Sequence, residues 1–228
     1  MKIKITYYLL VLFFVFWFET IVSQNTQKKK AVRRNPQKRS NSSLPVLFTP
    51  ITIRGITFRN RISVSPMTMS GSDGNGMATD FLLGHLQGFA LGGAGMVVME
   101  ATSISPQGLI SPTDNGIWSD KHIEPLTRIT RQIKMFGAVP GIQLNHAGRK
   151  GSCNVGWEGG DSIKDEDGGW PTVAPSALAY DKDSIWKVPK EATIEDIEEI
   201  KKDFAEAAKR AVKAGFDVRL KTNQLFNF

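Results

Sequence analysis

Apolar residues recur along most of the chain in short stretches that are typical of buried strands. Residues 62–64 alternate apolar and polar side chains, and Pro66 ends this first strand because proline has no backbone N–H to donate to a sheet. A continuous apolar run at 96–99 predicts a strand that is covered on both faces, and residues 138–144 predict the next strand. A fourth strand is expected to begin at 216–218.

Three stretches with helical spacing separate these strands. Thr79 can cap the first helix, Asp120 begins the second, and residues 193–196 form a capping-box-like start to the third. A glycine follows each helix and is expected to end it. Earlier in the chain, residues 51–53 and 56–58 predict a small hairpin with a tight turn between them.

Strands and helices alternate along the chain, which favours an α/β fold with a parallel sheet. The predicted strands end in polar residues, as at Glu100-Ala101-Thr102 and Asn145-His146. Either a (β/α)₈ barrel or a doubly wound sheet would gather such strand ends at one edge. No G-x-G-x-x-G motif follows the first strand, which counts against a dinucleotide-binding Rossmann start.

The positive charge of the chain is concentrated at its beginning. The net charge is +7 at pH 7, but residues 1–43 carry nine Lys or Arg and one Glu, which leaves the other 185 residues at −1. The globular part therefore has no general attraction for nucleic acid. Cys153 is the single cysteine, so no intrachain disulfide framework is possible, and the histidines show no metal-ligand spacing.

Residues 1–23 have the pattern of a targeting segment. Lys2 and Lys4 precede an apolar run at 5–18, and Ser23 could end a signal-peptidase site. A cleaved signal for the secretory pathway is the first interpretation, because the run is short for a membrane span. The alternative is an uncleaved anchor: seven basic residues follow the run and two precede it, which would leave the C-terminal domain on the cytoplasmic side.

Residues 24–43 predict a basic, disordered linker, because Gln, Asn, Ser, Lys and Pro dominate them and cannot build a core. Residues 5–39 could contact a membrane surface through the apolar run and the cations that follow it. From residue 44 the composition becomes that of a folded domain.

The folded part carries a set of short motifs in a recognisable order: Leu47-Phe48-Thr49-Pro50, Asn60-Arg61-Ile62, Ser65-Pro66-Met67, Glu100-Ala101-Thr102, Gly116-Ile117-Trp118, Gln143-Leu144, His146-Ala147-Gly148-Arg149-Lys150 and Val173-Ala174-Pro175-Ser176-Ala177. They resemble the N-terminal part of the old yellow enzyme family, and within it the bacterial-type NADPH dehydrogenases and xenobiotic reductases. The likeness covers residues 44–218. It implies the N-terminal half of a (β/α)₈ TIM barrel and an FMN-dependent NAD(P)H oxidoreductase.

The resemblance implies two half-reactions, in which hydride passes from NAD(P)H to FMN and then to an α,β-unsaturated carbonyl acceptor. Thr68 would donate to the flavin C4 carbonyl, where the bacterial branch usually has cysteine, and Gln143 would bind the pyrimidine edge. The residues expected along the flavin are Ser65, Pro66, Met67, Thr68, Ala101 and Gln143. By themselves these residues also allow ordinary alternatives: a capping hydroxyl at Thr68, a barrel-layer residue at Ala101 and a strand-end amide at Gln143. His146 is more typical of a structural hydrogen-bonding residue than of a catalytic one.

The chain departs from the family pattern at two places. Ser70 stands where the bacterial branch often has a substrate-facing tyrosine, and residues 219–223 stand where a pair of substrate-binding histidines, or His and Asn, is expected. We therefore expect a barrel truncated after about four strands, with residues 219–228 as a divergent tail, and assign no catalytic residue. An impaired oxidoreductase is one hypothesis. The other is a non-catalytic fragment whose basic leader binds a membrane or polyanion.

Overall fold

The computed structural model describes residues 44–181 and 186–223. The predicted targeting segment 1–23, the basic linker 24–43 and the membrane contact of residues 5–39 lie outside the described residues, as do the last five residues of the predicted tail. Among the helices that are described, none is long and apolar enough to cross a membrane.

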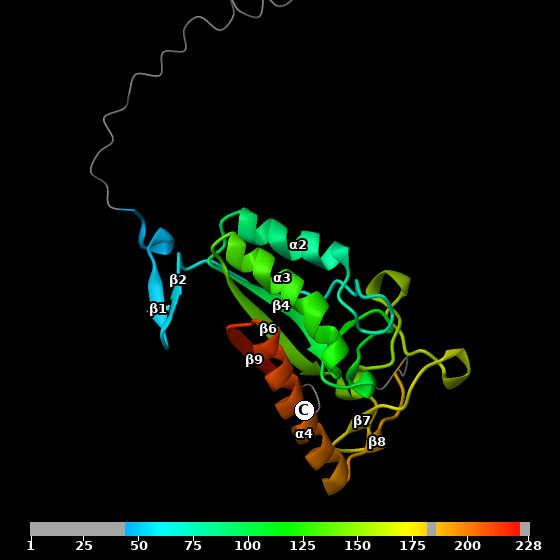
Figure 1. The fold of residues 1–228 in the computed structure, drawn as a ribbon. Coiled ribbons are helices and arrows are strands. Elements are labelled where there is room, and N and C mark those ends of the chain that lie inside the picture. The colour runs from blue at the N-terminus through cyan, green and yellow to red at the C-terminus, as the bar shows by residue number, and fades with distance from the viewer. Residues whose placement is uncertain (1–43, 182–185, 224–228) are drawn as a thin grey trace, which may run out of the picture. The chain divides into compact units, whose positions relative to one another are not determined.

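The centre of the fold is a parallel sheet, as the alternation of strands and helices predicts (Figure 1). Its main strands follow the order β3-β4-β6-β9, and the short strand β5 pairs with β4. Every pairing in this sheet is parallel. The strands are β3 (Ser63–Val64), β4 (Met96–Ser103), β5 (Asn115–Gly116), β6 (Val139–His146) and β9 (Val218–Asn223).

Two small two-stranded sheets accompany the central one. Strands β1 (Ile51–Ile53) and β2 (Ile56–Phe58) form the predicted antiparallel hairpin. Its turn has two positive φ angles, +48° at Arg54 and +81° at the following glycine, as a tight two-residue turn requires. Strands β7 (Val173–Ala174) and β8 (Lys190–Glu191) pair in parallel.

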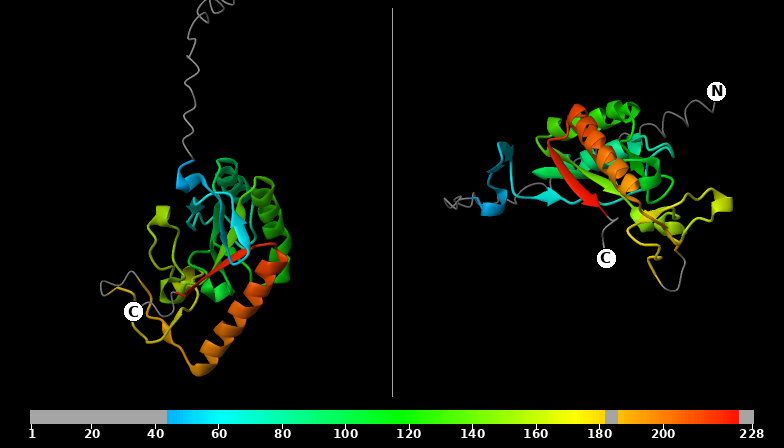
Figure 2. Two further views of the ribbon diagram at one scale, coloured as in Figure 1. Left: turned by 90° about the vertical axis from the view of Figure 1, so that its left-hand side faces the viewer. Right: turned by 90° about the horizontal axis from the view of Figure 1, so that it is seen from below.

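Helices α2 (Asp80–Leu91), α3 (Ile123–Met135) and α4 (Ile194–Lys213) cover one face of the central sheet. A single apolar cluster joins buried side chains of all three helices to outward-facing residues of β4 and β6. Helices α3 and α4 lie side by side over the sheet in Figures 1 and 2. Short 3₁₀ turns lie at Val46–Phe48, Pro106–Gly108, Asp120–His122, Gly148–Lys150, Gly156–Glu158 and Asp165–Asp167.

The opposite, inner face of the sheet is closely packed at its middle. A Cβ atom added to Gly141 of β6 would lie 3.1 Å from Val98 Cγ2 and 3.5 Å from Val218 Cβ. The layer formed by β4, β6 and β9 therefore leaves little room for a side chain at this position, because Val98 would have to move by a few tenths of an ångström. Because Ile142 belongs to the apolar cluster on the helix side, its neighbours 141 and 143 face the inner side by the two-residue period of a strand.

The helix starts agree with the predictions only in part. The capping box at Thr193 and Asp196 is confirmed, with reciprocal bonds of 3.2 and 2.8 Å between each backbone N–H and the other side chain. Thr79 precedes α2, but its hydroxyl donates to the Gly71 carbonyl at 2.6 Å and does not cap the helix. Asp120 lies in a 3₁₀ turn that Ser119 caps, so the α-helix itself begins three residues later than predicted.

Strand β9 extends further than the sequence pattern indicated. The apolar pattern stops near residue 218, yet residues 218–223 pair in register with 141–146 of β6. Backbone hydrogen bonds to an existing strand decide this extension, because they do not depend on side-chain periodicity. The described part of the expected tail is therefore strand, and its divergence from the family pattern remains a prediction.

The Arg59 side chain connects the C-terminal ends of helices α2 and α3 by hydrogen bonds, close to the start of the sheet. Its guanidinium donates to the carbonyls of Ala90, Ala94 and Phe136 at 2.6–3.0 Å. Ala90 lies in the last turn of α2 and Phe136 is the C-cap of α3. One planar cation thus satisfies carbonyls that a helix C-terminus leaves unpaired, at the negative end of each helix dipole.

Replacing Arg59 with alanine should lower the free energy of unfolding by about 3 kcal/mol, because several buried carbonyls lose a charged donor. R59K should recover only part of that loss, since an ammonium group cannot reproduce the planar fork. Urea unfolding followed by circular dichroism measures both. R61A is the control, because Arg61 is exposed and its side chain makes no hydrogen bond to a described residue. Equal stability of R59A and R61A would contradict this role.

Candidate functional site at the strand carboxyl ends

The carboxyl ends of the central strands bring several predicted site residues together. Ala101 of β4 pairs directly with Gln143 of β6, and Gln143 pairs with Leu220 of β9. Ser65 follows β3 immediately, on the other side of β4. These positions form a row across one edge of a parallel sheet, where α/β enzymes bind their ligands.

A β-bulge sets the direction of the Ala101 side chain. The register of β4 against β6 shifts between Met99, which pairs with Ile142, and Ala101, which pairs with Gln143. Glu100 is the extra residue. Without it, the two-residue period would turn Ala101 towards the helices; with it, Ala101 shares the inner face with Gln143.

The loop after β3 presents an exposed surface beside this row. Ser65, Met67 and Thr68 are exposed, and 52% of the Met67 surface is accessible to solvent. Within the described residues, the hydroxyls of Ser65 and Thr68 and the amides of Met67 and Thr68 have no hydrogen-bond partner. The loop thus combines an apolar side chain with free donors, which fits a flat heterocycle with a polar edge.

The buried carboxylate of Glu100 is hydrogen-bonded to the end of this loop. Its Oε2 accepts the Met69 amide N–H at 3.1 Å, and its Oε1 accepts from Asn115 Nδ2 at 2.8 Å. The residue is only 1% exposed. Burial raises the pKa of the Glu100 carboxyl from its ordinary value of 4.5 to about 7, and the two hydrogen bonds only partly oppose this effect.

Asp114 organises the next part of the same loop. Its Oδ1 accepts from the hydroxyls of Ser70 and Ser111 at 2.8 and 2.9 Å, and its Oδ2 accepts from the amides of Ile110 and Ser111, both at 2.9 Å. Ser70 has a positive φ of +46°. Its hydroxyl is thus engaged inside the protein, and the predicted substrate contact of Ser70 stays a prediction.

His146, at the end of β6, is buried and neutral. Its Nδ1 accepts the Gly148 amide N–H at 3.1 Å, so the ring proton lies on Nε2. Burial lowers the pKa of His146 to about 4. This is the hydrogen-bonding role that its sequence position favours. Cys153 is also buried, and burial raises the pKa of its thiol to about 11, which keeps it protonated and unreactive.

The described ranges contain no group of three His, Cys, Asp or Glu residues that could hold a metal ion. The sequence patterns assign no specific role to two residues that organise the site, Glu100 and Asp114. Glu100 directly follows the apolar run 96–99, which indicates a buried carboxylate. A buried acid needs specific hydrogen-bond partners, so this position pointed to a structural role. The sequence around Asp114 does not indicate burial, because this residue lies in a loop of ordinary polar composition.

Comparison with known proteins identifies the class of protein to which this fold and site belong. Residues 46–219 match the NADH:flavin oxidoreductase / NADH oxidase family, and the chain belongs to this family. An NADH:flavin oxidoreductase of Gibberella zeae is 46% identical over 186 residues, which are 80% of this chain and 45% of the relative. An NADPH dehydrogenase of Clostridium acetobutylicum is 46% identical over 171 residues, 75% of this chain and 46% of the relative.

Solved structures support the same assignment and confirm the predicted barrel fold. The old yellow enzyme homologue of Zymomonas mobilis has a TM-score of 0.63 and 30% identity, over 78% of this chain and 48% of that one. Morphinone reductase in complex with tetrahydroNAD has a TM-score of 0.62 and 27% identity, over 78% and 49% of the two chains. The chain thus spans about half the length of the relatives that it matches. The family description names flavin and NADH, and the Clostridium relative is named an NADPH dehydrogenase.

The raised pKa of Glu100 predicts a specific pH dependence of stability. Between pH 4.5 and about 7 the unfolded chain ionises at this residue before the folded chain does, so the free energy of unfolding should fall as the pH rises. The slope is at most about 1.4 kcal/mol per pH unit. Substituting Gln for Glu100 should remove this contribution from urea-unfolding measurements between pH 5 and 8.

E124Q is the matched control, because Glu124 is an exposed residue of α3. The opposite contribution of His146, whose lowered pKa makes stability rise with pH between about 4 and 6.5, is present in both variants and cancels. If E100Q and E124Q show the same slope, Glu100 does not titrate as inferred.

Proposed function

We propose that this chain provides the flavin-binding strands of an FMN-dependent NAD(P)H oxidoreductase of the ene-reductase type. The observation that carries the proposal is the row of Ala101 and Gln143 beside the donor-rich loop 65–68, in a chain that belongs to a flavin oxidoreductase family. FMN would accept hydride from NAD(P)H and deliver it to an α,β-unsaturated carbonyl acceptor. The complex of morphinone reductase with tetrahydroNAD supports a nicotinamide co-substrate for the family.

The residues present fit a flavin ring. The amide N–H groups and hydroxyls of the loop, which have no partner among the described residues, are donors for a ring carbonyl, and Thr68 would hold the C4 carbonyl. The Gln143 amide offers both a donor and an acceptor, which matches the pyrimidine edge. Ala101 is small and lets the ring lie close to the sheet, while Ser65, Pro66 and Met67 would line its side.

These residues bind and orient the cofactor, and none of them is proposed to transfer a proton to the substrate. Glu100 and Asp114 act through the loop: their bonds to Met69 and Ser70 keep the donors of residues 67 and 68 in place without a ligand. Ser70 would come near the acceptor only if its hydroxyl left Asp114. The acceptor class follows from the family resemblance.

A second candidate function concerns the basic leader. Residues 1–43 carry a net charge of +8, and we propose that they would direct the chain to the secretory pathway or bind an anionic membrane surface or polyanion. Salt-sensitive binding to anionic vesicles that survives deletion of residues 44–228 would favour this function. Binding that is lost with that deletion would count against it.

Flavin binding can be tested on the whole chain by titration with FMN, followed by quenching of flavin fluorescence. T68A and Q143A should each weaken binding about 5- to 30-fold, because each removes a hydrogen bond worth roughly 1–2 kcal/mol. T52A in the β1–β2 hairpin and Q132A on α3 are matched controls that should bind like the unaltered chain. Anaerobic addition of NADPH then shows whether the bound flavin is reduced.

Two outcomes would contradict the proposal in different ways. If the unaltered chain does not quench FMN fluorescence, it does not bind the flavin. If FMN binds but T68A and Q143A bind as tightly as T52A and Q132A, the flavin occupies another place.

A further inference from the structure

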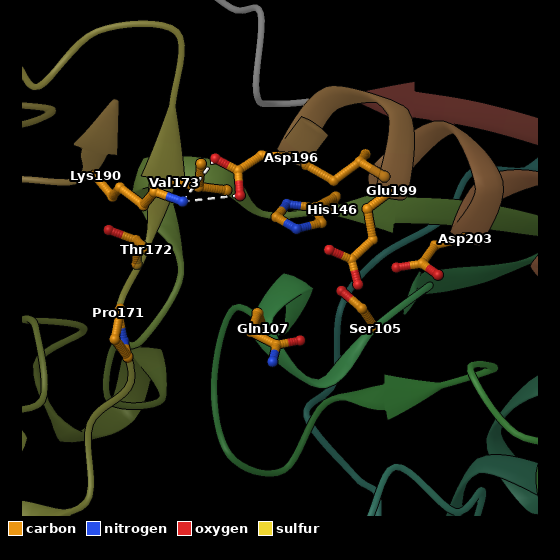
Figure 3. A pocket seen from close by; sticks show the side chains of 11 residues that line it. Ser105, Gln107, His146, Pro171, Thr172, Val173, Lys190, Asp196, Glu199 and Asp203 are labelled. Carbon is orange, nitrogen blue, oxygen red and sulfur yellow. Dashed lines mark hydrogen bonds and ion pairs between the residues drawn. The ribbon is translucent and has the colours of Figure 1, made fainter. Parts of the chain in front are cut away.

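A cavity of about 240 Å³ lies apart from the strand-end row, between α4, the β7–β8 pair and the turn after β4 (Figure 3). None of the residues proposed to touch the flavin lines it. Its volume is below the roughly 300–1,000 Å³ of sites for drug-sized ligands, so any ligand is small.

The wall formed by α4 carries an excess of negative charge. Asp196, Glu199 and Asp203 have helical spacing and line the cavity together. Lys190 neutralises Asp196, whose two carboxylate oxygens it contacts at 2.7 and 2.8 Å. Glu199 and Asp203 make no hydrogen bond or ion pair with any described residue. Burial and the neighbouring Glu199 charge raise the pKa of Asp203, an effect that a bound cation would oppose.

A buried donor faces the same cavity from the end of β6. His146 is 2% exposed, and its Nδ1 is occupied by the Gly148 amide, so Nε2 carries the proton. Figure 3 shows this ring nitrogen turned into the cavity, towards the space between Gln107 and Glu199. Within the described residues Nε2 has no hydrogen-bond partner. The ring is buried as a whole, but Nε2 is not among the fully buried atoms that lack a partner, so its N–H opens to the cavity and can donate to an acceptor atom of a ligand.

The two observations define the chemistry of the ligand. Two unpaired carboxylates attract a cation with several N–H donors, and the His146 Nε2–H requires an acceptor oxygen on the same molecule. A metal ion does not fit, because the described residues supply no set of three ligands and the ring nitrogen that faces the cavity carries a proton. A simple anion would be repelled.

We propose that this cavity is a second binding site, separate from the flavin site, for a small primary amine that carries a hydroxyl or carbonyl oxygen. The ammonium group lies between Glu199 and Asp203, and the oxygen accepts from His146 Nε2–H. Ser105, whose side chain also lines the cavity, offers a further hydroxyl to the polar end of the ligand. The proposal does not depend on flavin binding.

Three probes separate the two parts of this recognition on the full chain: 2-amino-1,3-propanediol, glycerol and 2-aminopropane. The first has both the cation and the acceptors, glycerol lacks the cation, and 2-aminopropane lacks the acceptors. Titration at pH 7 is followed by the ¹H–¹⁵N signal of the His146 Nε2–H group. The aminodiol should shift this signal saturably and bind about tenfold or more tightly than glycerol. 2-Aminopropane should bind weakly and leave the signal nearly unmoved.

Variants on the helix face identify the carboxylates. Changing Glu199 and Asp203 together to Gln and Asn should weaken aminodiol binding about tenfold or more, while E195Q, an exposed residue at the start of the same helix, should not change it. Three results would overturn the proposal: no saturable shift of the His146 signal, equal affinity for the aminodiol and glycerol, or unchanged binding in E199Q/D203N.

Discussion

The parallel pairing of β4 with β6 is the constraint on which the rest of the structure depends. On one face, their outward side chains, such as Met99 and Ile142, join the apolar cluster that holds all three helices. On the other face, Ala101 and Gln143 stand next to each other at the strand ends. Glu100 is one extra residue in β4. Because of it, Met99 faces the helices together with Ile142, and Ala101 faces the inner side together with Gln143. Packing and the candidate site therefore depend on the same register.

Buried acids give the loop after β3 its shape before any ligand arrives. Glu100 and Asp114 are almost fully buried, and their oxygens accept from amides and hydroxyls of the protein. Such groups are costly to bury unless they are hydrogen-bonded, so the loop that satisfies them has few alternatives. The strained backbone at Ser70 is consistent with this, because the bond to Asp114 helps to hold a left-handed conformation that serine seldom adopts.

Helix α4 serves two separate purposes on its two sides. Its apolar side places Phe204, Ala207 and Ala211 in the core, which fixes the helix on the sheet next to β9. Its polar side presents Glu199 and Asp203 to the cavity that His146 also lines. Because the core contacts orient the helix, the carboxylates are held towards the cavity although no cation of the described residues forms an ion pair with them. The flavin-site residues lie on β4, β6 and the loop after β3, and none of them lines the cavity, so the two sites share the scaffold but not their contacts.

The amino-acid sequence by itself determined the order of strands and helices, the β1–β2 hairpin, the capping box at Thr193 and the family of the chain. These features are local: they depend on periodicity, turn residues and short motifs that neighbouring positions specify. Only the tertiary structure decided the bulge at Glu100, the engagement of the Ser70 hydroxyl, the proton position on His146 and the extension of β9 past residue 218. Most of these depend on partners far apart in the chain, such as Ser70 with Asp114 and Met69 with Glu100. Such contacts exist only after the strands have paired, and for that reason no local pattern could predict them.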